Sequence, residues 1–166
     1  NRAGTLSRSL ESVLSQTHQN LEVVVVDDGS TDTTIKTLTS YQERDARIRI
    51  IALDKNSGAS VARNRGLDEA SSDYIMVWDS DDVLYPQAIA TALLVFSKHH
   101  AVGVVSAPCR QLLAGQEIAY QKRDEGVLTL GQIISKYVPN NEKVRIVKRE
   151  FFATVRYPAR NIDFIV

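Results

Sequence analysis

Two runs of strand-forming residues in this chain each end abruptly in clustered acids. The first run is Leu21–Val26, in which four of six residues are valine, and Asp27-Asp28-Gly29 follows it directly. A continuous valine run is typical of a strand buried on both faces, as in a parallel sheet covered by helices. In open α/β sheets, ligands bind beyond the carboxyl ends of such strands. The sequence therefore predicts a ligand site just after Val26.

The second run, Tyr74–Trp78, ends in Asp79-Ser80-Asp81-Asp82. Carboxylates this close raise one another's pKa, so a chain keeps them together mainly where a hard cation such as Mg²⁺ or Mn²⁺, or a donor-rich loop, offsets the repulsion. If both strands run parallel, their acidic tips share one edge of the sheet. The cluster then favours a metal site, and an acidic surface turn is the alternative.

Local turn chemistry accounts for the rest of the first acidic segment. Gly29 permits a tight turn and a close backbone approach. Asp32 is expected to cap the helix that follows. This leaves Asp27 or Asp28 to accept hydrogen bonds from ligand N–H and O–H groups, and a simple Asx-type turn is the alternative.

Helical and strand periodicities alternate to about residue 107, which predicts an α/β fold with a mostly parallel sheet flanked by helices. The remainder, residues 108–166, is expected to form a mixed α+β part of the same single domain. The expected helices are 5–15, 35–41, 59–70 and 86–98, and the expected strands are 21–26, 48–52, 74–78 and 102–107. In the second part we expect a hairpin of 109–113 with 118–121, a helix at 130–136 and a strand at 144–147.

Composition narrows the classes of function. A 166-residue chain with 43% hydrophobic residues can bury one sizeable core. Lys+Arg and Asp+Glu both number 20, without a basic tract, so nucleic acid is not expected as a partner. No apolar run approaches the ~20 residues of a membrane span. The single cysteine, Cys109, fits a reducing compartment, and we expect a soluble cytoplasmic domain.

Four segments within about residues 1–100 share a recognisable pattern: Ser12–Thr17, Leu21–Asp32, Asn56–Gly66 and Asp79–Asp82. Taken together and in this order, they resemble family 2 glycosyltransferases with the GT-A fold. The resemblance implies a GT-A-like, Rossmann-related fold in which 1–107 is the nucleotide-sugar-binding half and 108–166 the acceptor side. It also implies a first strand before Asn1 that this chain lacks.

The resemblance further implies a reaction and its residues. The family transfers a sugar from a nucleotide diphosphate donor, here most simply a UDP-sugar, to an acceptor hydroxyl, with inversion at the anomeric carbon. Asp28 is implied to contact the nucleobase or ribose, Asp79 the ribose and a metal-bound water, and Asp81 the Mn²⁺ or Mg²⁺ that bridges the phosphates. A glycan or lipid-linked acceptor is implied, and polysaccharide assembly at the inner face of a bacterial membrane follows by analogy alone.

Arg63 is a further candidate for contact with the donor. It lies early in the helix expected after Gly58. The alternative is an arginine that is solvated or paired with Asp68 or Glu69.

Asp163 is the candidate general base. An acceptor hydroxyl is a poor nucleophile, and inversion by a single displacement needs a carboxylate to take its proton. The family places an acidic pair downstream of the metal motif, whereas here Asn161 and Ile162 depart from that pair and leave Asp163, whose alternative role is a helix N-cap. Glu142 and Glu150 are lesser candidates.

Two other functions stay open. A non-catalytic nucleotide-sugar-binding domain would keep Asp28 and Asp81 but lack a competent base. A haloacid-dehalogenase-like phosphatase would use Asp79 as a phosphorylated nucleophile. That second function leaves Asp27-Asp28 and Ser57–Gly66 unexplained.

Overall fold

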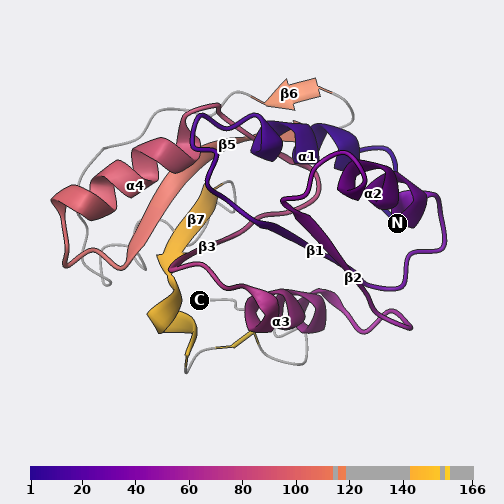
Figure 1. The fold of residues 1–166 in the computed structure, drawn as a ribbon. Coiled ribbons are helices and arrows are strands. Elements are labelled where there is room, and N and C mark those ends of the chain that lie inside the picture. The colour runs from indigo at the N-terminus through magenta and orange to yellow at the C-terminus, as the bar shows by residue number, and fades with distance from the viewer. Residues whose placement is uncertain (114–115, 119–142, 154–155, 158–166) are drawn as a thin grey trace.

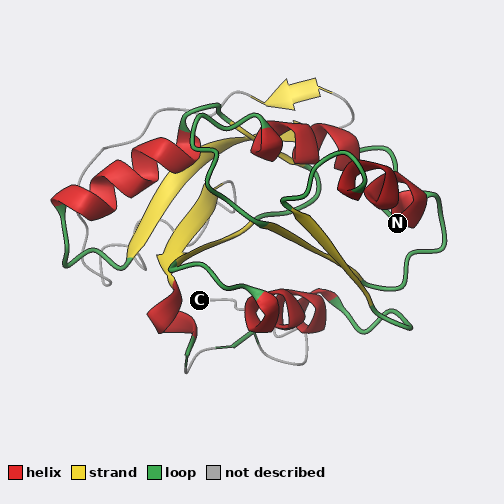
Figure 2. Cartoon of the chain, in the orientation of Figure 1, coloured by secondary structure: helices red, strands yellow, loops and turns green. Residues whose placement is uncertain are grey.

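The computed structural model describes residues 1–113, 116–118, 143–153 and 156–157. Helices α1, α2 and α4 lie over one side of the strands and α3 lies on the other (Figure 1), and Figure 2 shows the same layers by element type. The α/β layering expected from the alternating pattern is confirmed. In chain order the elements are α1 (Leu6–Leu14), β1 (Val23–Asp27), α2 (Thr34–Gln42), β2 (Ile48–Ala52), α3 (Ala59–Glu69), β3 (Tyr74–Val77), β4 (Asp82–Leu84), α4 (Ala88–Lys98), β5 (Val104–Leu113), β6 (Gln116–Ile118), β7 (Lys143–Lys148) and the 3₁₀ helix η1 (Arg149–Phe152).

The valine run forms β1, which pairs in parallel with β2. The register runs from Val23 opposite Ile48 to Asp27 opposite Ala52. Val23 and Asp27 are buried and the three valines between them are half-buried. Because the two strands are parallel, their carboxyl ends meet at one edge, and the acidic segment after β1 begins there.

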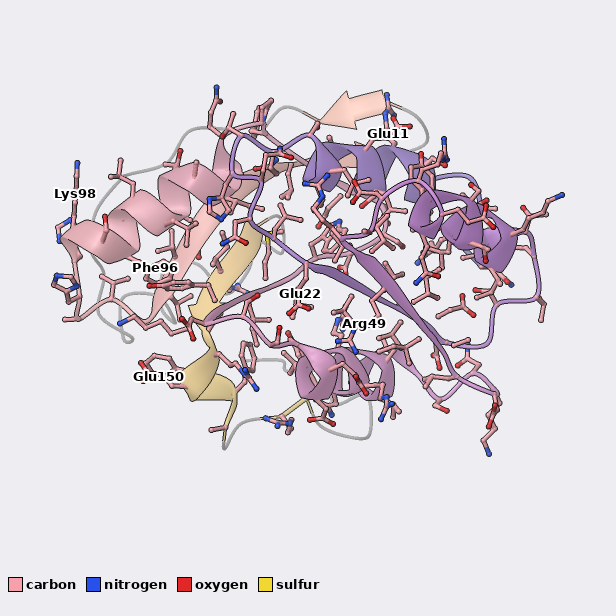
Figure 3. All side chains as sticks on the ribbon, viewed as in Figure 1. Glu11, Glu22, Arg49, Phe96, Lys98 and Glu150 are labelled. Atoms are coloured by element: carbon pink, nitrogen blue, oxygen red, sulfur yellow. The ribbon has the colours of Figure 1, made fainter. Side chains whose placement is uncertain are left out.

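Polar contacts fix β3 relative to β1 although the two strands are not paired. Glu22, just before β1, accepts hydrogen bonds from the backbone N–H and the hydroxyl of Ser71, just before β3, at 2.7 and 2.9 Å. The amino ends of β1 and β3 therefore lie together. They lie beside the end of α3, where Arg49 of β2 pairs with Glu69 at 2.6 Å (Figure 3). Both strands run from the end of α3 toward its start.

The remaining strands form a second sheet in the order β3-β7-β5-β4, with β6 added to β5. β3 and β5 are both antiparallel to β7, so they run parallel to each other, as the alternating pattern predicted. The pattern did not predict that β7, from much later in the chain, lies between them. Periodicity identifies a strand but does not identify its partners.

The two strands expected on either side of Pro108 are one continuous strand, β5, which corrects the sequence prediction. Pro108 is the last residue paired with β7, and Cys109 is the first residue paired with β4. A proline nitrogen has no hydrogen to donate to a neighbouring strand. Proline is therefore tolerated here, where β5 changes from one partner strand to the other. The expected hairpin is present, with Leu113 opposite Gln116, but its second strand is Gln116–Ile118 rather than 118–121, of which 119–121 lie outside the described residues.

Two apolar clusters hold the helices against the strands. The larger joins α1, α2, β1, β2 and the segment around β4, and its fully buried members are Leu6, Leu10, Val13, Val23, Leu38, Ile48, Leu84 and Ala88. The smaller packs α4 on β7 through Ala92, Phe96 and Ile146. Phe96 also contacts the ring of Tyr74, with centroids 4.7 Å apart (Figure 3). Trp78, just after β3, is half-buried and packs against the larger cluster.

Three expectations for segment boundaries have different outcomes. α4 begins at Ala88 rather than at Pro86, because Ala88 N–H bonds back to Tyr85 and the carbonyl of Pro86 accepts from Thr17 at 2.9 Å. The helix expected at 130–136 lies outside the described residues. The strand before Asn1 stays a prediction. In the part of the chain that is described, no helix has the length and apolar character to cross a membrane.

Candidate functional site

Asp28 binds the start of α3. Its Oδ1 accepts from the backbone N–H of Ser57 at 2.6 Å, and its Oδ2 accepts from Gly58 N–H at 2.8 Å. Gly58, with a φ of +93°, is the residue just before the helix. Asp28 is therefore already engaged by the protein, which corrects the expectation that its carboxylate is free. Each carboxylate oxygen has a second lone pair, so it can still accept from a ligand.

The neighbours of Asp28 build the turn. Asp27 is 6% exposed, and its Oδ2 accepts from Ser30 N–H at 2.9 Å. Gly29 has a φ of +68°, and an added Cβ would lie 2.6 Å from the backbone nitrogen of Asn56. Both the tight turn and the close approach predicted for Gly29 are confirmed. Asp32 bonds Thr34 N–H at 2.9 Å at the start of α2, as expected for a capping residue, although the N-cap position itself is Thr33.

Arg63 reaches across from α3 to the second acidic segment. Its Nη2 donates to Asp79 Oδ1 at 2.8 Å, and the Asp79 side chain is 60% exposed. Arg63 thus pairs with neither Asp68 nor Glu69; on the same helix, Arg65 pairs with Glu69 at 2.8 Å. One helix therefore brings together three residues expected from the sequence. Asp28 holds its start, and Arg63 in its second turn contacts Asp79.

The acidic cluster carries an excess of negative charge. Burial raises the pKa of Asp82 to about 6, and the charges of Asp79 and Asp81 add to the rise. Asp81 is half-buried in the turn before β4. Within the described ranges, no three His, Cys, Asp or Glu side chains are arranged as a metal site. Mg²⁺ is commonly held by one or two carboxylates together with substrate phosphates, and Asp79 and Asp81 are two carboxylates close together in the sequence.

Polar residues on the buried face of α1 hold the acidic segment in place, a role that sequence reasoning missed. Ser9 Oγ accepts from the indole N–H of Trp78 at 2.6 Å and donates to the Asp79 carbonyl at 3.4 Å. Ser12 Oγ accepts from Leu84 N–H at 3.1 Å. The available signal was the position of Ser9 and Ser12 among the apolar residues of an amphipathic helix, where a polar side chain must find a buried partner.

The carboxyl-terminal part contacts the same helix. Asn64 exchanges two hydrogen bonds with the backbone of Tyr157, and Arg156 pairs with Asp68 at 3.2 Å. The candidate base Asp163 and the lesser candidate Glu142 lie outside the described residues.

Glu150, the third candidate base, is exposed on η1 (Figure 3). It borders a cavity of about 650 Å³ that is also lined by Asp73 and Tyr74 at the amino end of β3. Asp79 follows the carboxyl end of the same strand. Glu150 is therefore at the wrong end of β3 to act beside Asp79 and Asp81.

Comparison with known proteins gives the family. The model of glycosyl transferase family 2 matches residues 1–128. A provisionally named teichuronic acid biosynthesis glycosyltransferase of Bacillus subtilis, TuaG, is 46% identical over 74 residues, which are 45% of this chain and 29% of that protein. Residues 1–128, which the family model matches, contain all four segments on which the resemblance was based.

Solved structures give the fold. Staphylococcus aureus TarS 1-349 in complex with UDP superposes with a TM-score of 0.77 at 24% identity, over 96% of this chain and 48% of that one. The mannosyltransferase PcManGT of Pyrobaculum calidifontis, in complex with GDP-Man and Mn²⁺, gives a TM-score of 0.59 at 26% identity, over 64% of this chain and 32% of that one. The chain spans less than half of each protein it was compared with. On the family match and the shared GT-A-like fold, the chain belongs to glycosyl transferase family 2.

Proposed function

We propose that this domain binds a nucleoside diphosphate-sugar, most simply a UDP-sugar, and transfers the sugar to an acceptor hydroxyl with inversion. The observation that carries the proposal is the arrangement around α3, where Asp28 and the Arg63–Asp79 pair lie at the carboxyl edge of the strands. A carboxylate that accepts from nucleoside N–H and O–H groups, next to a cation and further carboxylates, suits a nucleotide diphosphate.

Each residue has a distinct role in this proposal. Asp28 accepts from the nucleobase or ribose, and Asp79 accepts from the ribose. Arg63 offers a planar, permanently charged group to the donor. Asp81, with Asp79, holds Mn²⁺ or Mg²⁺, which would offset the charge that develops on the leaving diphosphate. Burial is the main cause of the raised pKa of Asp82, and the negative charges of Asp79 and Asp81 raise it further, which supports a cation near these two carboxylates.

The acceptor side of the site needs a general base. Asp163 is proposed as the base that takes the proton of the acceptor hydroxyl. A role in polysaccharide assembly is proposed from the similarity to TuaG, which is named for teichuronic acid biosynthesis. A glycan or lipid-linked acceptor, and a place at the inner face of the membrane, are proposed by analogy with the family. The nucleotide complexes of TarS and PcManGT support the donor class.

The two alternative functions, a non-catalytic binding domain and a phosphatase, compare differently with this proposal. A non-catalytic nucleotide-sugar-binding domain would use the same donor site and differ only in the lack of turnover. The haloacid-dehalogenase-like function is set aside, because the acidic cluster that suggested it lies inside the matched family region.

A titration tests the donor site. UDP, GDP and their sugars are added to the 166-residue chain with Mn²⁺, with Mg²⁺ and with EDTA, and heat of binding is measured. We expect UDP to bind at least tenfold more tightly with either cation than in EDTA. Absence of binding to every nucleotide in all three conditions would contradict the proposal. Transfer to an acceptor, measured as UDP release, separates the enzyme from the non-catalytic alternative.

A further inference from the structure

Asn64 and Tyr157 are joined by a pair of hydrogen bonds across 93 positions of the chain. Asn64 Nδ2 donates to the carbonyl of Tyr157 at 2.8 Å, and the N–H of Tyr157 donates to Asn64 Oδ1 at 2.9 Å. A carboxamide offers a donor and an acceptor together, so it can pair with both peptide groups of one residue. Both residues are half-buried, so these bonds are partly shielded from water. They fix the backbone of Tyr157 on α3.

The ring of Tyr157 lies over the Arg63 guanidinium. Arg63 Cζ is 5.5 Å from the ring centroid, within the range of a cation–π contact. The same guanidinium donates to Asp79 at 2.8 Å. Arg63 is therefore held between an aromatic ring from late in the chain and a carboxylate of the acidic cluster.

Helix geometry explains why adjacent residues serve both contacts. Successive side chains of an α-helix point about 100° apart, so Asn64 faces Tyr157 while Arg63 turns toward Asp79. An arginine side chain that is free in solvent samples many rotamers, and ordering it costs conformational entropy. A ring packed on the guanidinium removes part of that cost before a ligand binds.

We propose that Tyr157, held by Asn64, is a positioning residue that fixes Arg63 beside Asp79 for donor binding. The inference rests on the proposed function, since it takes the Arg63–Asp79 pair as part of the donor site. It adds that donor affinity depends on a residue beyond the nucleotide-binding half. Tyr157 acts through Arg63 and needs no contact with the donor.

A double-mutant cycle tests the proposal, with UDP affinity in the presence of Mn²⁺ as the readout. Tyr157→Ala should weaken UDP binding about three- to tenfold, and Asn64→Ala should do the same because it releases the ring. Tyr157→Phe should bind as wild type, since the ring and both backbone hydrogen bonds remain. In the Arg63→Ala background, Tyr157→Ala should cause no further loss, because its effect passes through the guanidinium. A role in folding alone would not produce that dependence.

Matched variants keep the outcome decisive. Arg65→Ala removes an arginine of the same helix that pairs with Glu69, and it should leave UDP affinity unchanged. If Tyr157→Ala fails to fold, Tyr157→Leu keeps apolar bulk without the aromatic face and is measured instead. Wild-type affinity in the Tyr157 variant, or a loss that adds in full to that of Arg63→Ala, overturns the positioning role and leaves the donor site standing. A wild-type chain that binds no nucleotide overturns the proposed function, and this inference with it.

Discussion

Gln16 donates a hydrogen bond to the backbone carbonyl of Tyr85 at 2.8 Å. Its side chain is completely buried at the end of α1. The same amide nitrogen also donates to the Ser12 carbonyl at 3.0 Å, and Oε1 accepts from Ile89 N–H at 3.1 Å. One glutamine thereby ties the first helix to both sides of the turn that leads from the acidic segment into α4.

Gln16→Ala should lower the free energy of unfolding by about 2–3 kcal/mol, because it leaves buried backbone groups without this partner. Urea unfolding followed by circular dichroism measures the change. Gln87→Ala is the control, since Gln87 is exposed and makes no side-chain hydrogen bond at the start of α4; it should change stability by less than about 0.5 kcal/mol. Equal effects of the two substitutions would show that the buried amide is unimportant.

Gln16 also illustrates what the sequence could and could not predict. The apolar periodicity of α1 and the valine run of β1 identified both elements, because burial selects those patterns directly. Hydrogen-bond partners such as Tyr85 are about 70 positions away and leave no local pattern. For the same reason β7 was expected as a strand but not as the partner of β3 and β5.

The candidate site was also predictable from the sequence only in part. The rule that ligands bind beyond the carboxyl ends of parallel strands pointed to Asp28 and Asp79, and in the structure both residues contact α3 or the residue before it. It could not show that α3 connects them, with Asp28 at Gly58 and Arg63 at Asp79. Those contacts depend on how the helix packs across the strands, which the acidic motifs do not encode.

Asp28→Ala should affect both stability and ligand binding. Loss of its two bonds to the start of α3 should cost about 1–3 kcal/mol in unfolding free energy, and loss of a ligand partner should weaken UDP binding by about 1–3 kcal/mol. Thermal melting measures the first effect and calorimetric titration the second. Asp54→Ala, at an exposed position after β2, should change neither. Unchanged UDP affinity in a destabilised Asp28 variant would make Asp28 a structural residue only.

The lowered pKa of Asp45 should make the free energy of unfolding depend on pH. Hydrogen bonds from the Arg47 side chain and backbone lower the pKa of Asp45 to about 2, from 3.8. Arg47 also donates to the Leu14 carbonyl at the end of α1, at 3.2 Å. A depressed carboxyl pKa stabilises the folded state above pH 3.8, and this contribution is lost as the pH falls toward 2. Solvent screening limits it to about 0.5–1 kcal/mol.

The matching experiment compares wild type with Asp45→Asn by urea unfolding between pH 7 and pH 3. The wild type should be more stable by a constant amount from pH 7 to 5, and the difference should shrink from pH 4 downward. Asp54→Asn serves as the control and should match wild type at neutral pH. A difference that stays constant down to pH 3 would assign the effect of Asp45→Asn to packing rather than to charge.

Asp81→Asn should abolish the increase in UDP affinity that Mn²⁺ or Mg²⁺ provides. The amide keeps the shape of the side chain but removes the charge that a hard cation requires. Affinity in EDTA should be unchanged or slightly higher, because a phosphate then meets less negative charge. Asp73→Asn is the matched control, since Asp73 precedes β3 at the end opposite the acidic cluster. A cation effect that survives in Asp81→Asn would remove this residue from the metal site.

Asp163→Asn tests the proposed base, with Glu150→Gln as its control. If Asp163 takes the proton of the acceptor hydroxyl, the variant should keep the UDP and metal affinity of the wild type but lose ~10²-fold or more in turnover, the usual contribution of general-base catalysis. The loss should appear in kcat rather than in the donor KM, because the contact acts in the transition state. Glu150→Gln should retain full turnover, since Glu150 lies beside Asp73 and Tyr74, at the far end of β3 from Asp79. Near-wild-type turnover in Asp163→Asn would eliminate that residue and direct the search to Glu142, whereas a loss in Glu150→Gln would contradict the position of the site at the carboxyl end of β3.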